Sequence, residues 1–247
     1  MPADSQTILA HLHGVAAERV KRHGAPALHA AVAAVKAYQQ QRFAHTYVDL
    51  LASARYRGAT QFFLDELYGP RDFTARDTQF ARVVPALVRL FPHAIVDTVA
   101  TLAELHALSE ALDSATALQA TVDDAAATPA LDAPAYLAAW QATGRAADRE
   151  RQITLLVDVG RSLDRITRNP LLRQSLRLMR PAARAAGLGD LQTFLESGFD
   201  TFKAMRGAGE FLETVETRER ALARALFEAD TSNLDDRRRV FGLLPGA

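Results

Sequence analysis

The chain of 247 residues contains no cysteine. This absence excludes disulfide bonds, thiolate metal sites and a cysteine nucleophile. Neither sign of charge is in excess, because 29 basic residues balance 29 acidic ones, and nucleic-acid backbones require a basic surface. The one notable basic cluster, arginines 237–239, directly follows Asp235 and Asp236 and is typical of a solvated, self-neutralising segment. We therefore expect no nucleic-acid partner.

Long apolar runs are also missing. No uninterrupted apolar stretch approaches the roughly 18 residues that a membrane-spanning helix needs. The N-terminal sequence MPADSQTILAHLHG lacks the apolar segment of a secretory signal. Hydrophobic residues make up 49% of the chain and charged residues 23%, which is the composition of a soluble globular protein. We expect a cytoplasmic protein with no membrane span.

Alternation of apolar and polar residues with a period of two, the pattern of a half-buried strand, is not found over a strand's length. The apolar residues instead recur at three- and four-residue steps, which predicts amphipathic helices. Within residues 149–168 this stripe consists of Leu156, Val159, Leu163 and Ile166. We expect an all-α fold, a compact bundle of roughly eight to ten helices.

One segment near the middle of the chain has the composition of a linker. The sequence TVDDAAATPALDAP at 121–134 is acidic, rich in small residues and contains two prolines. We expect a single helical domain over 1–247, which this linker could divide into subdomains 1–120 and 135–247.

Residues typical of helix ends predict several boundaries. Thr74 and Asp77 are spaced as in a capping box, which predicts that Thr74 caps the start of a helix. Upstream, one helix is predicted from Tyr47 to about Leu67, because the following YGP sequence disfavours helix. Gly198 lies inside the apolar stripe of a helix at 191–205 and predicts the close approach of a second backbone.

The stretch FFLDELYGPRDF at 62–73 places Asp65 and Glu66 in the last turn of a predicted helix, where the helix dipole disfavours negative charge. Arg71 and Arg76 are the expected partners of these acids. A structural network of salt bridges is one interpretation of this corner, 62–80. The other is that the corner forms one wall of a site for a protein partner or an apolar small ligand. The binding residues expected there are Asp65, Glu66, Tyr68, Arg71, Asp72 and Asp77.

A longer stretch, FFLDELYGPRDFTARDTQFARVVPALVRLFP, resembles the signature segment of an uncharacterised, all-helical bacterial family marked by FFLxxLYGPRDF. The likeness extends through AELHALSEALD and into FLESGFDTFKAMRGAGEFL. The resemblance implies a helical fold, and it carries over no catalytic signature.

Two histidine–carboxylate pairs are candidates for a metal site. His45 with Asp49, and His106 with Glu110, are each four residues apart, a spacing that places both members on one face of a helix. The Glu-x-x-His pattern of di-iron helical bundles does not occur, however. A short stretch at 187–198 also resembles the distal helix of haem oxygenases. It would need an axial histidine from the N-terminal helix, such as His11, His13 or His23.

Two functions of different classes remain open. The first is a non-enzymatic binding or interaction protein that uses the corner at 62–80. The alternative is a helical metal-dependent or haem-linked oxidoreductase that uses His45, Asp49, His106 and Glu110. The lack of thiols, of nucleotide-binding motifs and of excess charge favours the first, and we expect no metal and no other cofactor.

Overall fold

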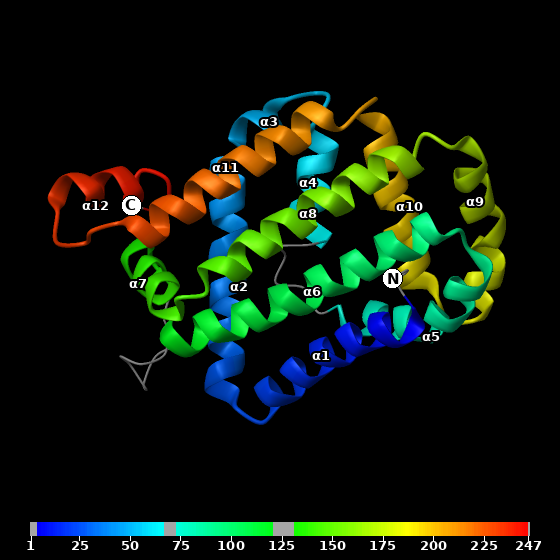
Figure 1. The fold of residues 1–247 in the computed structure, drawn as a ribbon, viewed down its shortest axis with the longest axis horizontal. Coiled ribbons are helices and arrows are strands. Elements are labelled where there is room, and N and C mark those ends of the chain that lie inside the picture. The colour runs from blue at the N-terminus through cyan, green and yellow to red at the C-terminus, as the bar shows by residue number, and fades with distance from the viewer. Residues whose placement is uncertain (1–3, 67–72, 121–130, 247) are drawn as a thin grey trace.

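The computed structural model describes residues 4–66, 73–120 and 131–246 of the chain (Figure 1). Twelve helices form within these ranges, and no strand is found there. The fold is therefore all-α, as the sequence predicts, but the predicted number of eight to ten helices is too low. The helices are α1 (Ser5–His23), α2 (Pro26–Thr46), α3 (Val48–Ala52), α4 (Arg57–Glu66), α5 (Thr74–Leu90), α6 (His93–Ala120), α7 (Ala133–Thr143), α8 (Ala146–Ile166), α9 (Pro170–Ala185), α10 (Gly189–Ala204), α11 (Gly209–Glu228) and α12 (Leu234–Phe241).

Four long helices lie side by side along the molecule in the order α1, α6, α8 and α11, and α2 crosses behind them (Figure 1). Helix α6 has the central position, because it packs against α1, α2, α7 and α8. Helices α7 and α12 lie at one end of the molecule, and α9 lies at the opposite end. Within the described ranges, no helix is long and apolar enough to cross a membrane.

Helix α8 follows the sequence pattern closely. Its residues Leu156 and Val159 are buried, whereas Arg161 is exposed and forms an ion pair of 3.7 Å with Asp158. An i,i+4 ion pair of 2.6 Å also forms between Arg168 and Asp164. Both pairs have the spacing that stabilises a helix surface.

The region 47–66 differs from its prediction. The sequence predicts one helix from Tyr47, but the chain forms α3 and α4 with a break between them. Ser53 adopts an extended conformation with φ −72° and ψ 124°, and its hydroxyl accepts a hydrogen bond from the amide of Tyr56 at 3.3 Å. Serine offers the backbone this alternative to a helical hydrogen bond, which explains the break.

The predicted capping box at Thr74 is wrong. Phe73 occupies the N-cap position of α5 and makes no side-chain capping hydrogen bond, and Thr74 is the first residue of the helix. Asp77 cannot serve the cap because its carboxylate faces inward and binds Arg19 and His106.

The principal apolar cluster joins residues from both sides of the predicted linker, including Phe43, Phe63, Leu156 and Phe211. Residues 121–130 of that linker lie outside the described ranges, and α7 begins at Ala133. The division into two subdomains stays a prediction.

Candidate functional site

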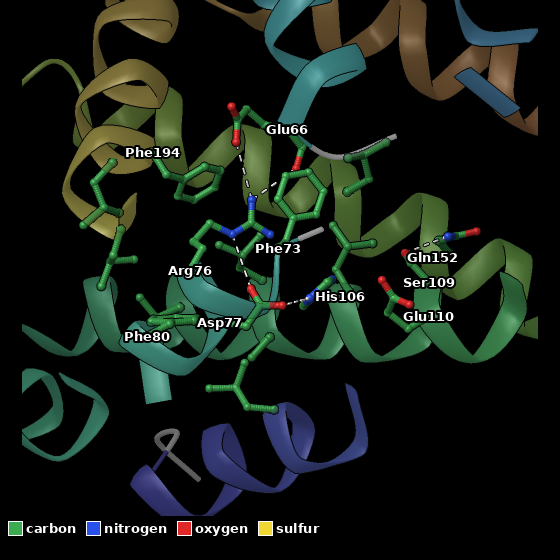
Figure 2. Close-up of a pocket in the computed structure, with 18 of the residues that line it drawn as sticks. Glu66, Phe73, Arg76, Asp77, Phe80, His106, Ser109, Glu110, Gln152 and Phe194 are labelled. Atoms are coloured by element: carbon green, nitrogen blue, oxygen red, sulfur yellow. Dashed lines mark hydrogen bonds and ion pairs between the residues drawn. The ribbon is translucent and has the colours of Figure 1, made fainter. Parts of the chain in front are cut away.

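A cavity of about 130 Å³ lies among α1, α2, α5, α6, α8 and α10, with further contacts from the end of α4. Most of its wall is apolar, and Figure 2 shows many of the side chains that line it. Four polar residues of the wall lie along α6, from His106 past Ser109 and Glu110 to Asp113, and α2, α4, α5 and α8 contribute the other polar groups. The apolar wall includes Phe73, Phe80, Leu102, Leu105, Phe194 and Leu195.

Asp77 on α5 joins three helices at one end of this cavity. Its Oδ2 accepts hydrogen bonds from Arg19 Nη2 at 2.6 Å and from His106 Nε2 at 2.7 Å, and its Oδ1 lies 3.3 Å from Arg76 Nε. Burial alone would raise the pKa of Asp77, but the hydrogen bond to His106 and the nearby charges outweigh it and hold this pKa well below its ordinary value. The carboxylate therefore stays ionised and fixes the His106 ring with its Nε2–H as the donor.

Arg76 connects α4, α5 and α10. Its guanidinium lies between two aromatic rings, 4.1 Å from the centroid of Phe73 and 4.7 Å from that of Phe194 (Figure 2). It also forms an ion pair of 3.5 Å with Glu66 and donates to the carbonyl oxygen of Glu66 at 3.3 Å. A planar guanidinium is suited to this combination of stacking and hydrogen bonding.

Glu110 holds together the polar end of the cavity. Its carboxylate binds Arg22 of α1 and accepts a hydrogen bond from Lys36 Nζ of α2 at 2.6 Å. The backbone carbonyl of Glu110 accepts a second bond from Arg22, at 2.7 Å. Burial opposes ionisation, but the charges of Lys36 and Arg22, with a smaller contribution from His106, lower the pKa of Glu110 to about 2.

Asp113 lies one turn further along α6. It is buried and lines the cavity, it lies 3.8 Å from Lys36 Nζ, and it accepts no hydrogen bond from any residue that the structure describes. Burial raises the pKa of Asp113, the charge of Lys36 counteracts this and that of Glu110 adds to it, so that the pKa lies above its ordinary value. Nearby, Gln152 Nε2 donates to the hydroxyl of Ser109 at 2.8 Å.

The residues expected to bind at the 62–80 corner have different surroundings. Asp65 is half-buried and accepts a hydrogen bond of 3.0 Å from Gln61, whereas Glu66 and Asp77 line the cavity and both contact Arg76. Phe62 and Phe63, which flank the motif, are buried in the apolar core rather than in the cavity wall. Tyr68, Arg71 and Asp72 lie outside the described residues.

The spacing argument for His45 and Asp49 is wrong. His45 is exposed in the last turn of α2, and Asp49 belongs to α3, where both of its carboxylate oxygens accept hydrogen bonds of 2.7 Å from Arg218. The break at Tyr47 separates the two residues onto different helices.

His106 and Glu110 do share α6, but each has other partners, namely Asp77 for the imidazole and Arg22 with Lys36 for the carboxylate. Across the parts of the chain that the structure describes, no group of three or more histidine, aspartate or glutamate residues could hold a metal ion.

The histidines considered as axial ligands of a haem all lie on α1, which packs mainly against α2, α5 and α6. Helix α10, which contains most of the stretch that resembles haem oxygenases, packs against α4, α5, α8 and α9. The candidate histidines are His11, His13 and His23.

The basic residues that complete the site could not be predicted from local sequence. Arg19, Arg22 and Lys36 come from α1 and α2 and meet acids far along the chain, so no local spacing reveals them. One signal was available for their partner: Asp77 occupies a position in the apolar stripe that continues through Phe80, Val84 and Leu87 of α5. An acid in such a stripe indicates a buried charge that requires basic partners.

The family described as a domain of unknown function (DUF8198) matches residues 18–233 of the chain. The chain belongs to this family. The matched range contains every residue of the polar network around Asp77 and Glu110, including Arg19 and Arg22 of α1. No curated protein and no solved structure matches the chain.

Proposed function

We propose that this protein binds a small, mainly apolar molecule in the cavity along α6, and that it acts as a binding protein rather than as an enzyme. The observation that carries this proposal is a mainly apolar cavity with a limited set of polar groups in its wall. Ligand pockets typically combine a predominantly hydrophobic wall with a few placed polar groups that fix orientation.

The size of the cavity limits the ligand. An engineered apolar cavity of about 150 Å³ in another protein binds benzene, and the cavity here measures about 130 Å³. It therefore has room for a single small ring or a short branched chain. A cavity of this volume favours a small ligand over a protein partner, which would need a larger exposed surface.

Two further features support binding rather than catalysis. The corner at 62–80 supplies Glu66, Phe73, Arg76, Asp77 and Phe80 to the cavity wall. Asp77 pairs with Arg19 of α1, and Arg76 pairs with Glu66 of α4, so these charged groups link helices and maintain the shape of the cavity. No specific observation favours the oxidoreductase alternative, since the partners of His106 and Glu110 are arginine, lysine and aspartate side chains.

The proposal is tested by filling the cavity. Leu102 lines it, so Leu102→Phe should occupy part of the space, whereas Leu118 on the same helix is 53% exposed and lies outside the wall, so Leu118→Phe is the matched control. Benzyl alcohol and 1-hexanol serve as probes, with isothermal titration calorimetry and thermal melts as the readouts.

We expect both probes to bind the unchanged protein and Leu118→Phe and to raise their melting temperatures. Leu102→Phe should bind about tenfold more weakly or worse. A folded Leu102→Phe protein with unchanged affinity, or the failure of both probes to bind the unchanged protein, would overturn the proposal.

A further inference from the structure

Asp113 is a buried carboxylate in the wall of the cavity along α6, with an exposed fraction of 6%. Lys36 Nζ lies 3.8 Å from it, which is beyond hydrogen-bonding distance, and no residue that the structure describes donates a hydrogen bond to it. Asp77 and Glu110, by contrast, are each bound by two side chains. Of these three acids, Asp113 is therefore the one whose oxygens remain to bind a ligand.

Water is the expected neighbour of this carboxylate when the cavity holds no ligand, because a space of about 130 Å³ accommodates several water molecules. A ligand that fills the cavity displaces water from Asp113. If that ligand has no hydrogen-bond donor, the buried carboxylate loses its partner, which is costly. If the ligand has a donor, it replaces the water. The cavity should therefore discriminate between ligands of one shape by the presence of a donor.

The charges around Asp113 favour a neutral donor over an ammonium group. Lys36, Arg149 and Arg22 place positive charge near the carboxylate, and Glu110 places negative charge there. A ligand ammonium at Asp113 would lie within a few ångströms of Lys36 Nζ and would be repelled by it. A hydroxyl group can donate to the carboxylate without this repulsion.

We propose that Asp113 makes the cavity selective for small alcohols, whose hydroxyl donates a hydrogen bond to the carboxyl group of this residue. This inference rests on the proposed function, because it names the ligand class of the same cavity. A hydroxyl oxygen can also accept a hydrogen bond, and Gln39 lines the cavity with an Nε2 that has no acceptor among the described residues. Burial raises the pKa of Asp113, yet the carboxyl group can accept a hydrogen bond in either protonation state.

Three probes of nearly the same shape test this selectivity. Benzyl alcohol, ethylbenzene and benzylammonium have a hydroxyl, a methyl and an ammonium group at the same position, and isothermal titration calorimetry with the full chain gives their affinities. A purely apolar cavity would favour ethylbenzene, because the alcohol must give up its hydrogen bonds to water. We expect benzyl alcohol to bind at least as tightly as ethylbenzene, and about tenfold more tightly than benzylammonium.

Two substitutions at Asp113 separate the hydrogen bond from the shape of the cavity. Asp113→Ala removes the acceptor and should weaken the binding of benzyl alcohol about tenfold, since hydrogen bonds to an ionised group are strong, without weakening that of ethylbenzene. Asp113→Asn keeps a neutral acceptor and should retain part of the preference for the alcohol. Asp97→Ala, at an exposed position of α6 outside the cavity wall, is the control and should leave all three affinities unchanged.

Three results would overturn this inference while the proposed function stands. The first is a benzyl alcohol affinity that Leu102→Phe weakens but Asp113→Ala does not, or that Asp113→Ala weakens only as much as that of ethylbenzene. The second is ethylbenzene that binds about tenfold more tightly than benzyl alcohol, and the third is benzylammonium that binds as tightly as the alcohol. If Asp113→Ala does not fold, Asp113→Asn must weaken benzyl alcohol relative to ethylbenzene. If neither benzyl alcohol nor 1-hexanol binds the unchanged protein, the proposed function fails and this inference fails with it.

Discussion

Glu110 is a buried carboxylate whose ionisation depends on its neighbours. Arg22 from α1 and Lys36 from α2 bind it directly, and His106 and Asp113 are the titratable groups that face it from α6. Removal of one member of a buried ion pair leaves uncompensated charge in a medium that solvates it poorly. The stability of the junction between α1, α2 and α6 should therefore depend on this carboxylate and on pH.

The first prediction concerns Glu110→Gln. The pKa of Glu110 is lowered from 4.5 to about 2 in the folded protein, so its contribution to stability is complete above about pH 4.5 and is lost as the pH falls toward 2. At pH 7 the substitution should cost about 3–5 kcal/mol of the free energy of unfolding, because two basic groups are left without their acid. Urea melts between pH 3 and 7 should show this difference shrink below pH 4.5.

Glu213 provides the control, because it is exposed on α11. Glu213→Gln should change the free energy of unfolding by less than about 0.5 kcal/mol at every pH. A difference between Glu110→Gln and the unchanged protein that does not vary with pH would contradict the assigned role of the carboxylate.

Single residues of the site were predictable to the extent that their partners are close in sequence. The expected pairing of Glu66 with Arg76 is present at 3.5 Å, because the end of α4 lies near the start of α5. Asp65 accepts a hydrogen bond from Gln61, and its pairing with Arg71 stays a prediction because Arg71 lies outside the described residues. The contacts of Glu110 could not be predicted, since they depend on how α1 and α2 pack against α6.

At the scale of elements, glycines mark two close contacts between helices. Gly160 of α8 faces Leu212 of α11, and a Cβ atom at this position would overlap the Leu212 side chain. Gly198 of α10 faces the ring of Phe62, which would lie 3.2 Å from an added Cβ. The glycine at position 198 predicts a close approach, which the structure has, but the neighbour is an aromatic side chain rather than the predicted second backbone.

The second prediction compares the same substitution at two glycines. Gly14 lies inside α1 with no atom within 4 Å of an added Cβ, so Gly14→Ala should stabilise the protein by about 1 kcal/mol through helix propensity. Gly160→Ala gains the same propensity but must displace Leu212, which is buried, and overpacking costs about 1–3 kcal/mol. Denaturant melts should therefore show a net loss of stability for Gly160→Ala.

The two alanine variants test the packing of α8 against α11 directly. Equal stabilisation by Gly160→Ala and Gly14→Ala would show that Leu212 of α11 lies farther from Gly160 of α8 than it does in this structure. Combination with Leu212→Ala should remove the penalty at position 160, since the overlapping side-chain atoms are then absent.

The break between α3 and α4 shows what periodicity leaves undetermined at this scale. A 3.6-residue pattern continues across Ser53, so the pattern alone predicts one helix. The break depends on a hydrogen bond from the backbone amide of Tyr56 to the Ser53 hydroxyl, which competes with the hydrogen bonds of a continuous helix. The apolar stripes therefore predict which segments are helical, whereas the position at which a helix ends depends on individual side chains.

In the whole molecule, stability should be distributed unevenly. Helix α6 is surrounded by α1, α2, α7 and α8, and many of its side chains are buried. Helix α9 lies at one end, has α10 as its main packing neighbour and has no buried residue. The sequences of the two helices agree with this difference, because α6 is apolar around most of its circumference whereas α9 has one apolar face among polar residues.

The last prediction is that hydrogen exchange will separate these two helices. Backbone amides open with a free energy that follows local packing, so amides in the middle of α6 should exchange only through global unfolding, and those of α9 much faster.

Leu112 of α6 is fully buried, and Leu112→Ala should cost about 2–5 kcal/mol and speed exchange in α1, α6 and α8 together. Leu172→Ala, at a half-buried position of α9, should speed exchange in α9 while α6 keeps its protection. Amides in α9 that are as slow as those in α6 would instead mean that another surface covers α9 in solution, since α9 has no buried residue in this structure.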